Sequence, residues 1–189
     1  KPVPGFEKVP VVNVTWDGAS MFAKKVNASL PSGAQWEFAA RGGNKARRIY
    51  TDLEKKDYNY ANRYAGADAM DYVGVFVDNS YGKPAPVGTR MANELGIHDM
   101  CGNVWEWCYD FYSADAYYRS ARKSDPLNLY GNGQGLRVNR GGSWSSDAIF
   151  CRVTNRNYLS QSMYNPYLGF RIVAPLNNQT QNMANSNSR

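Results

Sequence analysis

The chain has 189 residues, 43% of them apolar, and its formal net charge at pH 7 is +6. This length and apolar fraction suit one hydrophobic core rather than two, and no run of about 18 apolar residues that could span a membrane occurs. The lysines and arginines are scattered, apart from Lys45, Arg47 and Arg48, and no nucleic-acid reader motif accompanies them. We therefore predict no nucleic-acid partner and no membrane span.

The N-terminal third predicts two helices. Thr15 is a candidate N-cap for a helix over residues 16–27. Its apolar positions repeat with the 3.6-residue period of a helix: Ala19, Phe22, Ala23 and Val26. Ser32 and Gln35 have the spacing of a capping box, which predicts a second helix over 33–41 that the following Gly-Gly pair ends.

The middle of the chain, residues 44–100, is predicted to be irregular, because turn signals rich in Gly, Asn, Asp and Pro recur through it. A loop-rich stretch of this length belongs in a compact domain only if its own side chains pack. Six tyrosines are candidates for that packing: Tyr50, Tyr58, Tyr60, Tyr64, Tyr72 and Tyr81.

The C-terminal half predicts short strands joined by loops. Residues 103–109 alternate, with Trp105 and Trp107 on one face and Val104, Glu106 and Cys108 on the other. The stretch 111–135 is predicted to be loop, and two further strands are predicted over 136–144, together with a turn, and over 168–174.

The predicted fold class is therefore α+β, with two short helices, short antiparallel strands and much ordered loop. We expect a single domain over residues 1–175. The tail, residues 176–189, is almost wholly Asn, Gln, Ser and Thr, and it is predicted to be disordered because it offers too little apolar surface to offset the entropy lost on ordering.

Three cysteines are too few, and odd in number, for a disulfide scaffold, and the spacing of Cys101, Cys108 and Cys151 does not fit a zinc knuckle. Two arrangements stay open at this point: one disulfide with one free thiol, or three buried thiols. The cysteines therefore do not indicate a compartment.

Three motifs carry a family resemblance. They are Pro10-Val-Val-Asn-Val-Thr-Trp16 followed by Leu30-Pro-Ser-Gly-Ala-Gln-Trp-Glu-Phe-Ala-Ala-Arg-Gly-Gly43, then Asn93-Glu-Leu-Gly-Ile-His-Asp-Met-Cys-Gly-Asn-Val-Trp-Glu-Trp107, then Arg140-Gly-Gly-Ser-Trp144 with Leu168-Gly-Phe-Arg171. In this order and spacing they resemble the formylglycine-generating-enzyme (sulfatase-modifying factor) family. The resemblance covers about residues 10–174 and implies an elaborated C-type lectin fold.

The same resemblance bears on catalysis. The family's oxidase binds copper(I) through a pair of cysteines that follows the Arg-Gly-Gly-Ser motif, because soft thiolates suit that ion. Cys151 holds the first of these positions, whereas Arg156 holds the second. Related sulfoxide synthases bind iron through several histidines, and this chain has only His98. We therefore predict that the chain is not an enzyme; the alternative is a formylglycine-type copper oxidase.

A calcium site is the one metal site that the resemblance implies. In the family, a Gly-Asn-x-Trp-Glu segment binds calcium, which here would use the Glu106 carboxylate and the carbonyls of Cys101, Gly102 and Val104. Calcium prefers about six to eight oxygens, and Glu106 could instead pair with an arginine. No other cofactor is expected. A calcium-dependent carbohydrate lectin is a second alternative, although Asn165-Pro166 lacks the Glu or Gln that usually precedes it in sugar-binding lectins.

The segment 145–168 suggests a binding role. It holds four Ser, three Asn and three Tyr, with no Lys, Glu or Gly, a composition typical of antibody paratopes. An ordinary polar loop is the alternative interpretation. Framed by Arg140-Gly-Gly-Ser-Trp144 and Leu168-Gly-Phe-Arg171, the segment resembles the variable region of proteins diversified by retroelements, among them the treponemal variable protein.

By that resemblance, a set of diversified positions would form a ligand-binding face, which we call the contact surface: Ser145, Ser146, Asp147, Ile149, Phe150, Asn155, Asn157, Tyr158, Ser160, Ser162, Tyr164, Asn165 and Tyr167. Ile149, Phe150 and Tyr158 could instead belong to the core; we expect them to be exposed, because aromatic anchors dominate contact energetics. Arg140, Gly141, Gly142, Trp144, Gly169 and Phe170 would hold the frame, with Trp105, Trp107 and Trp144 filling the core beneath.

The resemblance also implies a biological setting. We expect a monomer whose ligand is a protein or another macromolecule. A bacterial cell surface is the expected location, with a lipid anchor in a segment that is absent from this sequence. Residues Lys1 to Pro10 lack the apolar stretch of a signal peptide.

Overall fold

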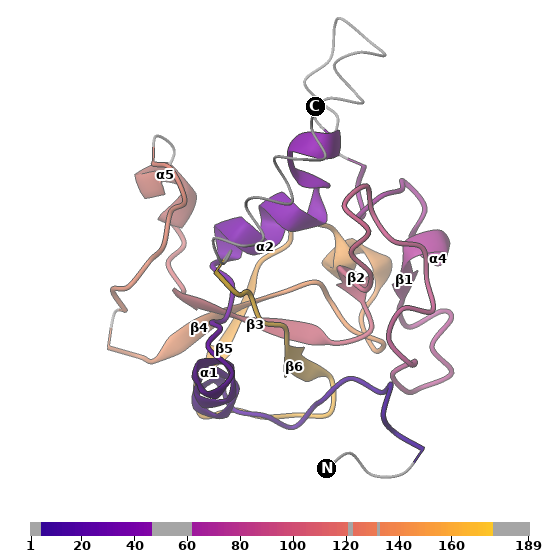
Figure 1. The fold of residues 1–189 in the computed structure, drawn as a ribbon, viewed down its shortest axis with the longest axis horizontal. Helices are drawn as coiled ribbons and strands as arrows, with labels where there is room; N and C mark the ends of the chain where they lie inside the picture. Colours follow the sequence, from indigo (N-terminus) through magenta and orange to yellow (C-terminus); the bar gives the residue numbers. More distant parts are fainter. Residues whose placement is uncertain (1–4, 47–61, 121–122, 132, 176–189) are drawn as a thin grey trace, which may run out of the picture.

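The computed structural model describes residues 5–46, 62–120, 123–131 and 133–175. A four-stranded sheet lies at its centre, in the order β5-β4-β3-β6 (Figure 1). These strands are β3 (Trp105–Phe111), β4 (Leu136–Arg140), β5 (Asn157–Ser160) and β6 (Leu168–Phe170). β4 pairs antiparallel with both β3 and β5, whereas β6 runs parallel to β3. A second, two-stranded sheet joins β1 (Gly74–Val75) and β2 (Cys101–Gly102), also in parallel.

The α+β class is confirmed. The predicted antiparallel pairing holds between β3 and β4 and between β4 and β5, but not for β6 or for the two-stranded sheet, which pair in parallel. β6 enters the sheet beside β3 after the long excursion through β4 and β5, and this route brings it in parallel to β3. The strand predicted over 168–174 is also shorter, since it ends at Phe170.

The two predicted helices form, and their predicted caps are confirmed. In α1 (Trp16–Lys25), the hydroxyl of Thr15 accepts a hydrogen bond from the Gly18 N–H. In α2 (Gly33–Ala40), Ser32 and Gln35 form the complete capping box. Each cap satisfies N–H groups that the first helical turn would otherwise leave unpaired.

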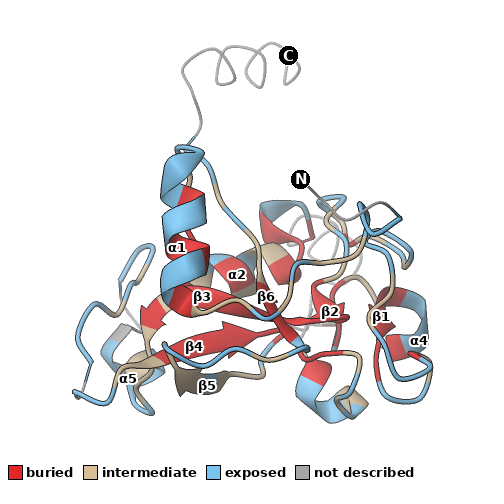
Figure 2. Ribbon diagram, turned by 90° about the horizontal axis from the view of Figure 1, so that it is seen from below, coloured by how far each residue is buried: buried red, intermediate tan, exposed pale blue. Residues whose placement is uncertain are grey.

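The helices cover opposite faces of the four-stranded sheet, α2 above it and α1 below it in Figure 1. Alternation along β3 explains the arrangement. Trp105 and Trp107 pack with Trp16 of α1 on one side, which we call the α1 face. Cys108 packs with Trp36 of α2 on the other side, the α2 face. Figure 2 shows β3 and β4 as mostly buried and β5, at the sheet edge, as intermediate.

The middle of the chain has more order than the sequence predicted. A short helix, α4 (Met70–Val73), leads directly into β1. Tyr64 is buried in the α2-face core, as predicted. The prediction is wrong for Tyr72 and Tyr81, which are 63% and 95% exposed; the buried Met70, Val73 and Phe76 fill that space instead. Tyr50, Tyr58 and Tyr60 lie outside the described residues.

Two further elements and the state of the cysteines complete the fold. Helix α5 (Ala116–Ser120) and the 3₁₀ helix η1 (Ala148–Cys151) were not predicted. All three cysteines are free and buried, which settles the open choice in favour of three thiols. No helix within the described ranges has the length and apolarity to cross a membrane. The tail predicted to be disordered, 176–189, lies outside the described residues.

Candidate ligand-binding surface

A tight glycine turn at the end of β4 directs the chain into the contact surface. Gly141 and Gly142 have φ of 96° and 75°, the left-handed region that favours glycine. A β-carbon on Gly142 would stand 2.4 Å from the Cys151 Sγ and 2.9 Å from the Cys151 Cα. Only a glycine therefore allows η1 to lie directly against the end of β4, which confirms the predicted framework role of this pair.

A buried serine fixes the first residues of the contact surface. The Ser143 hydroxyl is fully buried and lies 3.2 Å from the Ser145 hydroxyl and 3.0 Å from that of Ser146. The Ser146 N–H donates to the Ser143 carbonyl, and the Ser146 carbonyl accepts from the Val77 N–H. Ser145 and Asp147 are nevertheless exposed. The turn is thus held by the backbone and by the hydroxyls of three serines, and the exposed Ser145 and Asp147 side chains lie where a ligand can contact them.

Six positions of the contact surface border a single recess of about 380 Å³. We call this hollow the recess; its walls are Trp105, Ser145, Ser146, Asp147, Phe150, Asn155, Arg156 and Asn157. The Asn155 side chain donates to the Phe150 carbonyl at 2.9 Å, which ties the far end of η1 to the loop that follows it. Ile149 and Phe150 are 55% and 49% exposed, so the prediction that they are exposed is confirmed.

The contact surface is not one continuous face. Asn157 faces its partner Asn139 on the α1 face of the sheet, in the row that begins with Trp107. The next residue, Tyr158, points to the other side because side chains alternate along a strand, and its ring lies 4.0 Å from that of Tyr112. The expectation of a single patch is therefore wrong for Tyr158 and for Ser160, which shares its side. Both residues lie on the edge strand β5, which a ligand can contact from either face of the sheet.

The last part of the contact surface lies beside Trp144. The Trp144 indole N–H donates to the Pro166 carbonyl at 3.2 Å, and its ring meets that of Tyr167 edge-on at 6.5 Å. The Asn165 side chain accepts from the Tyr167 N–H. Tyr164 and Ser162 are exposed without filling a core position. Trp144 is half-buried rather than a core residue. Its hydrogen bond and ring contact connect the residues around 145 to those around 166.

A buried amide lies next to the recess. Asn139 is fully buried, and neither its side-chain oxygen nor its nitrogen has a hydrogen-bond partner among the described residues. It stands in register with Asn157, which lines the recess. Burying an unpaired amide costs about 1–3 kcal/mol, a cost that a polar ligand group could remove. The sequence did not indicate Asn139, Trp105 or Arg156 as residues of a binding site. The strand alternation assigned Trp105 to the core, Arg156 was noted only at the position of the family's second cysteine, and Asn139 was predicted only as part of the strand and turn over 136–144.

A buried arginine holds the loop that carries Asn155. The Arg140 guanidinium donates to the carbonyls of Val153 and Asn155, at 3.3 and 2.9 Å, and pairs with Glu37 at 2.7 Å. Tyr117 donates to the same Glu37 carboxylate. Burial alone would raise the pKa of the Glu37 carboxyl, but the charge of Arg140 and the hydrogen bonds from Tyr117 and Arg140 outweigh it and lower that pKa. The framework role predicted for Arg140 therefore has a geometric basis.

The predicted calcium ligands do not fit calcium. Both oxygens of the Glu106 carboxylate accept from Arg171, at 2.5 and 2.7 Å, and the Trp36 indole N–H donates to it at 2.6 Å. The attraction of Glu106 also outweighs burial and raises the pKa of Arg171. The described residues contain no group of three or more His, Cys, Asp or Glu side chains that could hold a metal ion. The alternative stated above, in which Glu106 pairs with an arginine, is the one observed; the carbonyls of Cys101, Gly102 and Val104 thus lack their carboxylate partner.

The cysteines do not fit a copper(I) site either. Cys151 is fully buried at the end of η1, and Arg156 is held by the Ser113 carbonyl and by the rings of Tyr112 and Tyr117. Burial raises the pKa of the Cys151 thiol to about 12, which opposes the thiolate that copper(I) needs. His98, the one histidine, faces the Arg90 carbonyl at 2.8 Å, as a loop residue.

The chain matches the model of the sulfatase-modifying factor enzyme 1-like domain over residues 2–176. It is 39% identical to the serine/threonine-protein kinase Pkn1 of Chlamydia trachomatis serovar L2 over 90% of this chain and 25% of that protein. It is 34% identical to the formylglycine-generating enzyme of Thermomonospora curvata over 87% of this chain and 55% of the enzyme. The chain thus spans only a quarter to about half of these relatives.

Solved structures share the fold. The Treponema denticola variable protein 1 superimposes with a TM-score of 0.64 at 22% identity, covering 91% of this chain and 74% of that one. PvdO from Pseudomonas aeruginosa superimposes with a TM-score of 0.67 at 25% identity, covering 87% and 61%. These likenesses confirm the predicted α+β fold of the formylglycine-generating-enzyme type.

Proposed function

Since the chain belongs to the sulfatase-modifying factor family, which includes the formylglycine-generating enzymes, we propose that it uses the family fold as a scaffold for ligand binding and is not itself an enzyme. The ligand is a protein or another macromolecule, and it is contacted through the variable region, about residues 145–167. The observation that carries this proposal is that every side chain of the contact surface is exposed or half-exposed, while the framework beneath it is closely packed.

The chemistry of the contact surface suits adaptable binding. Ile149, Phe150 and Tyr164 offer apolar and aromatic anchors, which carry much of the energy in protein contacts. The serine and asparagine side chains around them supply hydrogen bonds that can adjust to different partners. The recess, with the unpaired Asn139 amide beside it, gives one anchor of the ligand a place to enter.

The geometry weighs against the oxidase alternative. A copper(I) oxidase needs a second thiolate near Cys151, and Arg156 is a cation held against two tyrosine rings instead. An assay with copper(I), oxygen and a cysteine-containing peptide is expected to yield no formylglycine. The lectin alternative requires sugar binding that a calcium chelator abolishes, and the occupied Glu106 carboxylate gives no reason to expect it.

A display library tests the binding role. Randomising the positions of the contact surface should leave most members folded, because their side chains do not fill the core. Selection against a folded protein such as lysozyme is expected to yield binders that lose at least tenfold in affinity when reverted to the present residues. The control randomises the exposed positions of α1, Asp17, Met21, Lys24 and Lys25. If the two libraries yield binders equally often, or the first one unfolds, the proposal is wrong.

A binding face of this kind is useful where foreign ligands are met. We therefore also propose that the protein acts at a bacterial cell surface, as a monomer anchored through a lipid outside this sequence. Protease treatment of intact cells, with a cytoplasmic protein as the control, is expected to remove it; full protection would contradict the location without affecting the binding role.

A further inference from the structure

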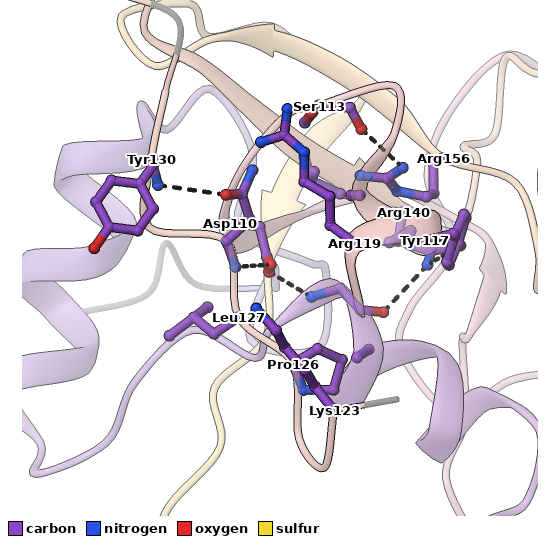
Figure 3. Close-up of a pocket in the computed structure, with 15 residues that line it drawn as sticks. Asp110, Ser113, Tyr117, Arg119, Lys123, Pro126, Leu127, Tyr130, Arg140 and Arg156 are labelled. Carbon is purple, nitrogen blue, oxygen red and sulfur yellow. Dashed lines mark hydrogen bonds between the residues drawn. The ribbon is translucent and has the colours of Figure 1, made fainter. Parts of the chain in front are cut away.

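A second pocket lies on the α2 face; it shares Arg156 with the recess but no other lining residue. Its volume is about 240 Å³, and it lies between the start of α2, the end of β3 and the loop after α5 (Figure 3). Arg140 and Asp110 line its inner part, and Arg119, Lys123 and Arg156 surround it further out. We call it the arginine pocket. Figure 3 shows Tyr130 on one side of it and Tyr117 with Arg156 on the other.

Cationic groups dominate this pocket. Four lining side chains are positive and only Asp110 is negative. Arg119 pairs with Asp115 and Arg140 with Glu37. Within the described residues, no salt bridge joins Lys123 or Arg156 to a carboxylate. The pocket therefore has positive charge that its own acidic neighbours do not neutralise.

One buried donor borders the pocket and has no acceptor. Arg140 is 1% exposed, and its Nε has no hydrogen-bond partner among the described residues, although its other two nitrogens are fully engaged. The missing side chain of Gly33 leaves a space beside it. A β-carbon there would stand 3.8 Å from the Arg140 Nε, 3.8 Å from the Asp110 Oδ2 and 3.7 Å from Val138. A ligand oxygen entering this space would reach the unpaired N–H.

The acidic residue of the pocket is already engaged. Asp110 accepts from the Gly33 N–H at 2.7 Å and from the Asn128 N–H at 2.8 Å. Its carboxylate thus joins the two walls of the pocket. A nearby negative charge opposes a doubly charged anion more than a singly charged one, which favours a carboxylate over a phosphate.

Much of the remaining lining is apolar, and the space is small. Ala34, Pro126, Leu127 and Val138 contribute hydrocarbon surface. Drug-sized ligands usually occupy about 300–1,000 Å³, so a volume of about 240 Å³ suits a single ring or one amino-acid side chain. We propose that the arginine pocket binds a small carboxylate attached to an apolar group, with the carboxylate directed at Arg140 and the apolar group against Val138 and Leu127.

Nuclear magnetic resonance of the folded chain tests this directly, with benzoate as the probe and benzamide as its neutral match. Benzoate is expected to shift the Arg140 Nε–H and Gly33 N–H resonances until the shift saturates. The dissociation constant from this titration should be at least tenfold lower for benzoate than for benzamide or inorganic phosphate. Acetyl-phenylalanine, which resembles the C-terminal end of a peptide, tests whether the pocket takes a peptide carboxylate or only a free small acid; its amide is the neutral match. Binding of acetyl-phenylalanine as tight as that of benzoate indicates a pocket open to peptide ends, and weaker binding indicates a free small acid. Equal responses to benzoate and benzamide would overturn the proposal.

Two variants separate the pocket from general effects. Gly33→Ala puts a methyl group into the space beside the Arg140 Nε at ordinary contact distances, so the chain should fold while benzoate binding weakens at least tenfold. Arg119→Gln with Lys123→Gln removes two of the three outer charges and should weaken binding several-fold. The control, Lys24→Gln with Lys25→Gln on α1, removes the same charge elsewhere and should leave binding unchanged. Unaltered binding by a folded Gly33→Ala protein would also overturn the proposal.

Discussion

The residues before and after Trp144 differ in how much room surrounds them. Before it, the Gly141-Gly142 turn lies so close to Trp36 and Cys151 that an added methyl group would crowd both, and Ser143 is fully buried. After it, every contact-surface side chain from Ser145 to Tyr167 is exposed or half-exposed, although Cys151 and Val153 between them are buried. Close packing, rather than polarity of the sequence, therefore limits where this fold can change its residues.

The largest expected effect is at the glycine turn. Gly142→Ala forces a β-carbon within 2.9 Å of the Cys151 backbone at a φ of 75°. Overpacking and left-handed strain each cost about 1–3 kcal/mol, so we expect the free energy of unfolding to fall by roughly 3 kcal/mol or more. Urea denaturation measures it.

The control for this change is Gly82→Ala. Gly82 has a similar φ of 74°, but nothing lies within 4 Å of its β-carbon position. It should therefore lose only the strain, about 1 kcal/mol. If the two variants were equally stable, the close approach of η1 to β4 would not affect stability. That result would contradict the inference that close packing restricts the residues of the glycine turn.

A smaller effect is expected where the framework meets the Asn155 loop. Glu37→Gln removes the charge that pairs with Arg140, and a hydrogen bond to a charged group is worth about 1.5–3 kcal/mol. The folded pKa of Glu37 is lowered from its ordinary 4.5. Its stabilisation is therefore complete above about pH 4.5 and is lost as the pH falls through the lower folded value.

The measurement is urea denaturation of both proteins between pH 7 and pH 3. The variant should be about 2 kcal/mol less stable at pH 7. The difference should shrink as the pH falls from 4.5, where Glu37 of the unfolded chain becomes protonated, through the lower pKa of Glu37 in the folded protein. Asp78→Asn, which removes one negative charge at an exposed position, is the control. A difference that stays constant with pH would mean that the Glu37 charge does not stabilise the fold.

Local signals in the sequence predicted what local contacts decide. The caps at Thr15 and at Ser32 with Gln35 act within three residues of the chain, and both helices begin where those caps predict. The alternation of Trp105 and Trp107 likewise predicted a strand and the face that those side chains bury.

Distant partners decided the rest. Glu106 is paired by Arg171, 65 positions away, so the motif around it could not show that its carboxylate is taken. β5 is an edge strand whose stability depends on pairing with β4, and its sequence of Asn, Tyr, Leu and Ser gives only a weak strand pattern. Missing β5 is also why the contact surface was expected to be one patch, since a loop has no fixed alternation of sides.

The smallest expected effects distinguish two tyrosines of the contact surface. Tyr158 is 43% exposed yet stacks on Tyr112, whereas Tyr164 is 63% exposed and makes no ring contact within the described residues. An aromatic pair contributes about 0.5–1.5 kcal/mol beyond the area it buries. Tyr158→Ala should therefore lower the free energy of unfolding by about 1 kcal/mol, while Tyr164→Ala should change it by less than about 0.5 kcal/mol. Urea denaturation of the two variants and of Tyr112→Ala checks this.

The double variant Tyr112→Ala with Tyr158→Ala completes a double-mutant cycle. A coupling energy near zero would show that the contact between the two rings does not stabilise the fold. Coupling of about 0.5 kcal/mol or more would place Tyr158 with the framework. In that case the freely variable part of the contact surface contracts to the positions around the recess and beside Trp144. The positions there whose side chains make no hydrogen bond or ring contact within the described residues, such as Ile149 and Tyr164, should change with the least loss of stability.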